Sequence, residues 1–226
     1  GERTSPQTVP GRKKLPRRTR MAAGCLLLMI PVTLFAGTFY LGDRKYYFIA
    51  LLMLLEGMLP FFLAFEGRRP QARELVVLAV MCALAVAGRV AIPIPSFKAI
   101  FGIIMIAGIA FGPESGFLVG AISALASNFF YSQGPYTPWQ MMAYGAGGML
   151  AGFVFAEGRL PRKPVVMGIF GFLAVAFFVG PLLDTCSVFL VMSRISLKGA
   201  MAFYISGFPV NLRQAVATAI VLLVLG

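Results

Sequence analysis

The residues with most to offer chemically lie together in one short stretch, 127–140, which reads SNFFYSQGPYTPWQ. Aromatic rings offer flat apolar faces and side-chain amides make directional hydrogen bonds, which is the combination that small-molecule pockets use. The candidates are Asn128, Tyr131, Gln133, Tyr136, Thr137, Trp139 and Gln140. An interfacial aromatic belt is the alternative, and it explains the rings but not the three amides. The stretch therefore indicates a pocket for a polar ligand, with the belt still open.

Charged residues also occur within or at the edges of apolar runs, where an ionised group is costly unless it faces a cavity or another charge. Arg89, Asp184 and Arg213 fall toward the same end of their runs as the stretch 127–140. Either arginine can meet an anionic ligand or pair with Asp184, and snorkelling of each side chain to the interface is the alternative. Glu56 lies near the middle of another run and receives no role.

Little in the chain suggests catalysis. There is no histidine, which removes the commonest general base and metal ligand. Cys25, Cys82 and Cys186 lie in separate apolar runs without metal or disulfide spacing. No GxxxxGK[ST] phosphate loop occurs, so the chain carries no ATPase of its own. We expect a protein that is not an enzyme and that has no cofactor or metal.

The elements that must position these residues are membrane helices. The chain is 59% hydrophobic and 12% charged, against about 25% charged in soluble domains, and its mean hydropathy is +0.85. Long apolar runs recur throughout, which predicts an all-α, polytopic helical membrane protein. The predicted spans are 21–41, 46–65, 73–92, 98–112, 116–132, 138–156, 164–192 and 208–226. Gly112-Pro113-Glu114-Ser115 is predicted to be a tight turn, and Thr137 the N-cap of the sixth span.

Charge placement predicts both orientation and domain organisation. The net charge is +12, but seven of the twenty basic residues lie in the first twenty positions and most others flank apolar runs. That distribution argues for lipid headgroups and against nucleic acid. With the N-terminus inside, thirteen basic residues fall on the inner side and five on the outer side. We expect a disordered cytoplasmic tail over 1–20, a helix pair over 21–66, and a six-helix body over 71–226, with both termini inside.

Small residues recur at helical spacing in several spans. Ala79, Ala83, Ala87 and Ala91 form one slanted stripe on the third span. Such a stripe lets another backbone approach closely, either a partner protein or a neighbouring helix of the same bundle. Gly116 and Gly120, like Gly148 and Gly152, stand four residues apart and predict close helix contacts inside the bundle.

Several segments in the same order resemble one known family. GRVAIPIPSFKAI, FGPESGFLVGAISALASNFFYSQGPYTPWQM, the alanine stripe and GFPVNLRQAVAT together resemble the S component of an energy-coupling factor (ECF) vitamin transporter. The resemblance covers about 71–226. The two additional N-terminal helices and QGPYTPWQM look most like the branch associated with cobalamin and its precursors. The N-terminal pair departs from the smaller members of the family.

The resemblance implies a plasma-membrane subunit that captures a vitamin at its outer face and is not itself an enzyme. Ala79, Ala83 and Ala87 match the motif that docks on a separate coupling subunit, which carries two ATP-binding subunits. The family's ligand-holding regions correspond here to 93–98, which includes Phe97 and Lys98, to 128–140, and to the surroundings of Asn211. We expect tyrosine and tryptophan rings to pack on the ligand and Asn128, Gln140 and Asn211 to hydrogen-bond it. Arg89 or Arg213 is expected to meet a phosphate.

Three alternatives remain open at this point. The same architecture can serve another vitamin, such as riboflavin or a queuosine precursor. A membrane-embedded enzyme acting on lipid-linked substrates would need an acid pair or a cluster of metal ligands at one depth, and the sequence shows neither. A structural assembly subunit would need only the alanine stripe.

Overall fold

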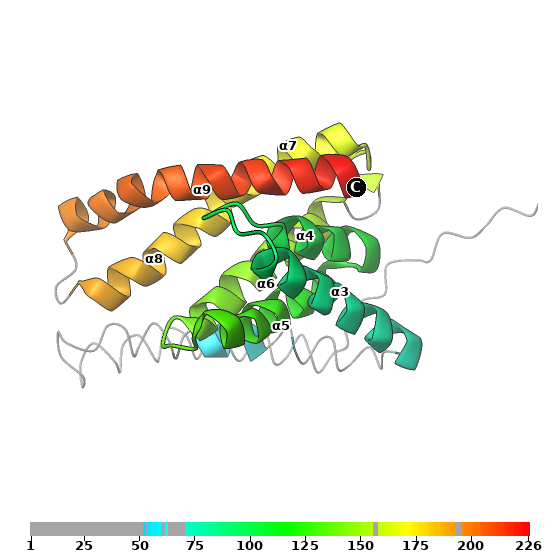
Figure 1. Cartoon of the computed structure of the whole chain (residues 1–226), viewed down its shortest axis with the longest axis horizontal. Coiled ribbons are helices and arrows are strands. Elements are labelled where there is room, and N and C mark those ends of the chain that lie inside the picture. The colour runs from blue at the N-terminus through cyan, green and yellow to red at the C-terminus, as the bar shows by residue number, and fades with distance from the viewer. Residues whose placement is uncertain (1–51, 53, 60–61, 63–70, 156–157, 193–195) are drawn as a thin grey trace, which may run out of the picture.

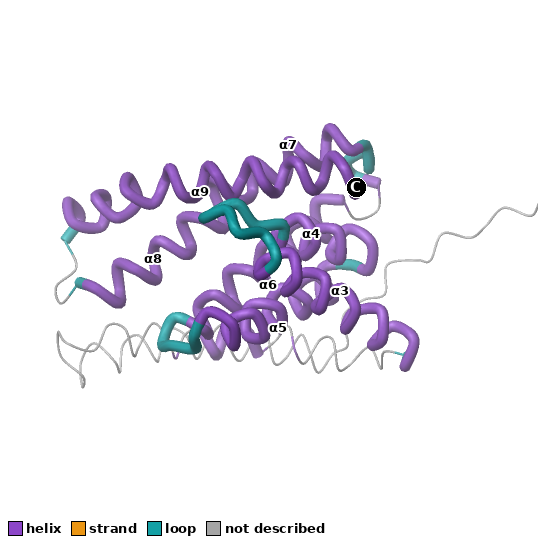
Figure 2. Tube along the Cα trace, in the orientation of Figure 1, coloured by secondary structure: helices purple, strands orange, loops and turns teal. Residues whose placement is uncertain are grey.

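Figure 1 shows the computed structural model of the chain. It describes residues 52, 54–59, 62, 71–155, 158–192 and 196–226. Helices are the only regular secondary structure in these ranges, as the tube of Figure 2 shows. The predicted all-α class is confirmed for this part of the chain. The predicted tail over 1–20, the first span and most of the second lie outside the described residues.

The described helices follow the predicted third to seventh spans closely. They are α3 (Ala72–Val90), α4 (Ile100–Phe111), α5 (Pro113–Tyr131), α6 (Thr137–Phe155), α7 (Pro164–Ala174), the π-helix η2 (Val175–Val179), α8 (Gly180–Val191) and α9 (Leu197–Leu225). The predicted seventh span, 164–192, is thus a single rod formed by α7, η2 and α8. Each boundary of α3 to α6 and of the α7–α8 rod lies within about three residues of the prediction, because the long apolar runs determine them.

The prediction for the last span was wrong at its start. It placed the helix at 208–226, whereas α9 begins at Leu197 and includes Lys198, which was assigned to a connection. Pro209, the second residue of the predicted span, lies inside the helix. Ser196 caps the real start, since its hydroxyl accepts a hydrogen bond from the Gly199 N–H. Membrane helices tolerate an internal proline when neighbouring groups satisfy the freed backbone.

The predicted four-residue turn after the fourth span was also too long. Gly112 alone joins α4 to α5, at φ +98°, a backbone conformation that glycine adopts without strain. Pro113 and the two residues after it already belong to the first turn of α5. Proline suits that position because its missing N–H would have no helical partner there.

Glycine contacts hold α4, α5 and α6 together, as the spacing predicted. A Cβ atom on Gly116 would lie 2.6 Å from the Cα of Gly108 and 2.7 Å from the carbonyl carbon of Gly148. A Cβ on Gly152 would lie 2.6 Å from the backbone of Pro113. No side chain fits at these points, so the three backbones touch directly. This close packing holds the first turns of α5 against the C-terminal half of α6.

The described part of the predicted second span packs on the same helices. Residues 52, 54–59 and 62 are helical, and Leu54 and Met58 are buried against Phe117 and Ala121 of α5. The rings of Phe62 and Phe117 meet edge to face at 6.0 Å. Glu56 lies on this short stretch and is half-buried.

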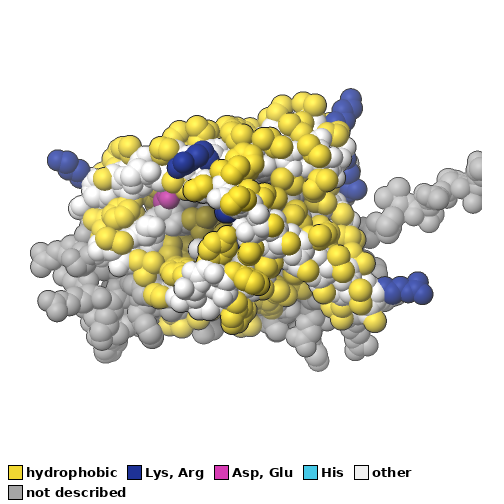
Figure 3. Space-filling model, in the orientation of Figure 1, with side chains coloured by type: hydrophobic (Ala, Val, Ile, Leu, Met, Phe, Trp, Pro, Cys, Tyr) yellow, Lys and Arg dark blue, Asp and Glu magenta, His cyan; other side chains and the backbone are white. Residues whose placement is uncertain are grey.

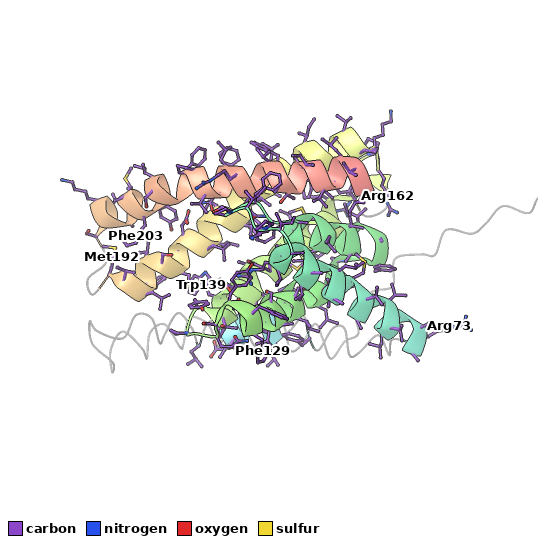
Figure 4. The ribbon with its side chains drawn as sticks, viewed as in Figure 1. Arg73, Phe129, Trp139, Arg162, Met192 and Phe203 are labelled. Atoms are coloured by element: carbon purple, nitrogen blue, oxygen red, sulfur yellow. The ribbon has the colours of Figure 1, made fainter. Side chains whose placement is uncertain are left out.

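The bundle has two distinct ends. Arg73 and Arg162 lie at one end, where α9 also terminates, and Met192 lies at the other (Figures 1 and 4). Among the described residues, Pro164–Val191 and Leu197–Leu225 are long and apolar enough to cross a membrane, with mean hydropathies of 2.4 and 1.7. Ile100–Phe111 is apolar but shorter. We call the Met192 end the distal end.

Candidate functional site

Arg89, in the last turn of α3, is the centre of a polar cluster near the distal end. Its Nη1 donates hydrogen bonds to Ser127 Oγ at 2.5 Å and to Asn128 Oδ1 at 2.8 Å, both on α5. Its guanidinium carbon lies 5.0 Å from the ring centroid of Tyr131 and 5.6 Å from that of Tyr144. Aromatic faces attract such a cation. All of these described partners are uncharged, so the arginine keeps a net positive charge at this place.

Asn128 extends the cluster from α5 to α6. Its side chain is fully buried, and its Nδ2 donates to Gln140 Oε1 at 2.7 Å and to Thr137 Oγ1 at 3.2 Å. Thr137 in turn donates to Gln133 Oε1 at 2.9 Å and accepts from the Gly134 N–H at 3.2 Å. Thr137 is the first residue of α6 rather than its predicted N-cap. Its hydroxyl makes hydrogen bonds within the cluster. Buried polar groups of this kind are costly unless each of them has a hydrogen-bond partner.

Trp139 connects α6 to α8. Its indole N–H donates to the carbonyl oxygen of Leu182 at 2.6 Å, and its ring lies 5.6 Å from that of Phe189. Figure 4 shows Trp139 between these helices. Tyr136, by contrast, donates its hydroxyl to the Ser132 carbonyl at 2.7 Å and stabilises the connecting turn.

Asp184 and Asn211 connect α8 to α9. Asn211 is almost fully buried, and its Nδ2 donates to Asp184 Oδ2 at 2.7 Å. One turn of α8 carries both Asp184 and Thr185, whose hydroxyl lies 2.8 Å from the hydroxyl of Tyr204 on α9. The partner of Asp184 in the described structure is thus an amide and not either of the predicted arginines.

The connection between α3 and α4, residues 91–99, makes hydrogen bonds to both α9 and α3. Gln214 on α9 donates to the Lys98 carbonyl at 2.6 Å. Lys98 Nζ donates to the Ile92 carbonyl, and the Ala99 N–H bonds to Gly88 of α3 at 3.0 Å. Phe97 lies half-buried in the same segment. The C-terminal end of this segment is therefore bonded to both α9 and α3.

Together these bonds form a ring of contacts around the distal half of the bundle. It runs from α3 through α5, α6, α8 and α9 and returns through residues 91–99. The space-filling view shows the surface hollowed between α8 and the adjoining ends of α5 and α6 (Figure 3). Most of the predicted site residues belong to this ring, which brings together segments that are far apart in sequence. We call the hollow beside the ring the recess.

The sequence predicted some of the residues in this ring of contacts and did not predict others. Arg213 is exposed on α9, apart from the cluster that Arg89 occupies. The residues not predicted are Ser127, Tyr144, Thr185, Tyr204 and Gln214. Two of them carried a usable signal, because Tyr144 follows Gln140 by one helical turn and Gln214 follows Asn211 by nearly one, which places each pair on one helix face.

The alanine stripe of α3 points away from the described bundle. Ala79, Ala83 and Ala87 are exposed in the described structure. An apolar groove with a volume of about 530 Å³ runs beside the stripe; its lining comprises Cys82, Ala83, Val86, Ala87, Val90, Ala91, Ala126 and Phe130. The described helices therefore leave this stripe uncovered, against the alternative that it packs inside the bundle.

The described residues hold no group of three or more acidic, cysteine or histidine side chains that could bind a metal ion. What the fold and the site define is a helical membrane protein with a ring of polar contacts beside a surface hollow toward one end. The family model of the S component of ECF-type riboflavin transporters matches residues 70–226. This match covers well over half of the chain, so the chain belongs to that family. Comparisons with curated proteins and with solved structures gave no match.

Membership makes the chain the substrate-binding membrane subunit of an ECF transporter, and the resemblance found in the sequence is confirmed at that level. It also implies a coupling module as partner and a vitamin as substrate. The assignment to the cobalamin branch is not confirmed.

Proposed function

We propose that the recess beside the ring of contacts is the vitamin-binding site, and that it faces the outside of the cell. The observation that carries this proposal is the hydrogen-bonded cluster of Arg89, Asn128 and Gln140, which joins three helices at one place. A polar cluster of this size inside a lipid-embedded bundle is costly, and such clusters are usually retained for a ligand or an ion.

The charges around the recess indicate the chemistry of the ligand. In the described structure the hydrogen bonds of Arg89 leave from Nη1, so Nε and Nη2 are available to an acceptor-rich or anionic group. Asp184 accepts from Asn211 through Oδ2, so Oδ1 is available to a hydroxyl or N–H of the ligand. The proposed ligand therefore has acceptors at one side and donors at the other.

Two vitamins are the leading candidates. Riboflavin is supported by the printed description of the matching family, and its ring carbonyls and hydroxylated chain supply acceptors and donors. A cobalamin-type corrinoid is supported by the QGPYTPWQM stretch and the additional N-terminal helices. A queuosine precursor remains the further vitamin alternative. A catalytic role on lipid-linked substrates has no support from the described residues, whose polar cluster contains no acid pair.

Binding by the purified full-length protein distinguishes the candidates. Isothermal titration with riboflavin and with cyanocobalamin is expected to give a submicromolar Kd for one of them. Trp139→Ala is expected to weaken that binding about tenfold, or about 1.4 kcal/mol, because it removes the hydrogen bond from Trp139 on α6 to Leu182 on α8. If neither vitamin binds at millimolar concentration, the proposed site is contradicted for both.

We further propose that the alanine stripe beside the groove is the docking surface for the coupling subunit. Ala83→Leu is expected to place a bulky side chain where the partner backbone must approach. The two ATP-binding subunits and the coupling subunit should then no longer copurify, while vitamin binding remains within about twofold of wild type. Leu84→Ala, on a neighbouring exposed position outside the groove lining, is the matched control and should retain the complex. Copurification with the Ala83→Leu variant at wild-type yield would refute the docking role.

A further inference from the structure

The rod formed by α7, η2 and α8 changes its helical geometry at one level. η2 (Val175–Val179) is a π-helical segment, and the Gly180 N–H bonds to Val175 five residues back rather than four. Pro181 follows at once and has no N–H to donate into the preceding turn. Such a widened turn next to glycine and proline is a point where a helix bends.

Helix α9 has its own weak point at the same level. Pro209 lies inside α9 and cannot donate to the carbonyl oxygen of Ile205. The two weak points face each other, since the rings of Phe177 and Phe208 are 6.4 Å apart. In addition, a Cβ atom on Gly180 would lie 2.5 Å from Cγ of Asn211. Two irregular turns side by side form a hinge more readily than either would alone.

The contacts differ on the two sides of this level. On the C-terminal side of Pro209, α9 packs tightly: a Cβ on Gly168 would lie 2.9 Å from Leu223, and one on Gly171 would meet Leu222 and Thr218. On the other side, α8 is joined to the first part of α9 by the Thr185–Tyr204 bond. The bond that Asn211 donates to Asp184 joins α8 to α9 two residues past Pro209, at the level of the pivot. The described hydrogen bond from that unit to α6 is the one donated by Trp139 to Leu182.

We propose that Gly180–Val191 and Leu197–Phe208 form a hinged flap over the recess, and that Trp139 is its latch. The flap pivots at the level of η2 and Pro209 while α7 and the rest of α9 stay fixed. Release of the Trp139–Leu182 bond separates α8 from α6 and widens the hollow between them, and re-formation of that bond closes it. Leu182 offers a backbone oxygen, so the latch depends on the position of α8 and not on a particular side chain at that site.

Hydrogen exchange on the wild-type protein in lipid nanodiscs tests the hinge without any ligand. Amides in 180–191 and 197–208 are expected to exchange together, at least about tenfold faster than those in 164–174 and 212–225. Equal protection on both sides of the hinge would overturn the proposal. The outcome does not depend on which vitamin binds, so a failure here is distinct from a failure of the proposed function.

The single tryptophan makes the latch directly observable. Trp139 is the only tryptophan of the chain, so its fluorescence quenching by acrylamide reports how often the latch is open. The double variant Pro181→Ala/Pro209→Ala supplies the two missing N–H groups and should stiffen the hinge, lowering the quenching constant at least about twofold. Pro113→Ala/Pro164→Ala is the matched control, because both prolines lie at helix starts where no bond is missing. An unchanged constant in the first variant, or an equal fall in the control, would overturn the latch.

Discussion

Replacing Arg89 by glutamine is expected to weaken vitamin binding about a hundredfold, equivalent to about 2.7 kcal/mol. The guanidinium is the positive charge held by Ser127, Asn128 and the rings of Tyr131 and Tyr144, and its Nε and Nη2 face no described partner. A shorter neutral amide removes the charge and the forked donors, which lysine or glutamine cannot reproduce. Titration of the purified variant with the vitamin that binds wild type measures the effect.

Arg213→Gln is the matched control for this prediction. It removes the same charge from an exposed position on α9, and binding should remain within about twofold of wild type. The melting temperature of each variant in detergent separates a loss of ligand contact from a loss of fold. If Arg89→Gln binds as tightly as wild type, or if Arg213→Gln loses as much affinity, Arg89 is not the ligand's anchor.

Replacing Gly148 by alanine is expected to destabilise the bundle by about 3 kcal/mol, because overpacking a rigid contact forces backbones apart. The added Cβ would lie 2.7 Å from the carbonyl carbon of Gly116 and 2.7 Å from Cγ2 of Ile104. Backbone atoms of α5 cannot yield as a side chain can. The melting temperature in detergent should fall sharply, and binding should fall with it, since α5 and α6 carry Asn128 and Gln140.

Gly147→Ala gives the matched comparison one residue earlier on the same helix. Its Cβ would lie 3.0 Å from Cγ2 of Val179, a side-chain atom that can shift by a few tenths of an ångström. We expect a change of less than about 1 kcal/mol, within the range of tolerated core changes. Similar melting temperatures for the two variants would show that α5 and α6 are not held by direct backbone contact.

The predicted spans agree with the observed helices where one sequence property, such as the length of an apolar run, determines the boundary. Apolar runs of sufficient length determine α3 to α8, and glycines four residues apart predicted the contact of α5 with α6. The prediction for the start of α9 was wrong, and Pro209 lies inside that helix. In the bundle, that helix continues because its flanking turns pack on α8 and η2. Local propensity is a weak guide once tertiary contacts supply the missing stabilisation.

The sequence by itself determined that this chain is a helical membrane protein, that it belongs with the S components, and that Asn128 and Gln140 share one polar stretch. The first and third follow from composition, periodicity and nearby residues, and the second follows from the resemblance of several segments to a known family. Only the tertiary structure decided that Arg89 meets Asn128, that Asp184 meets Asn211, and that Trp139 bonds to α8. The physical reason is that each of these bonds joins residues 27 to 43 positions apart on different helices, and helix packing alone determines which of them come within hydrogen-bonding distance.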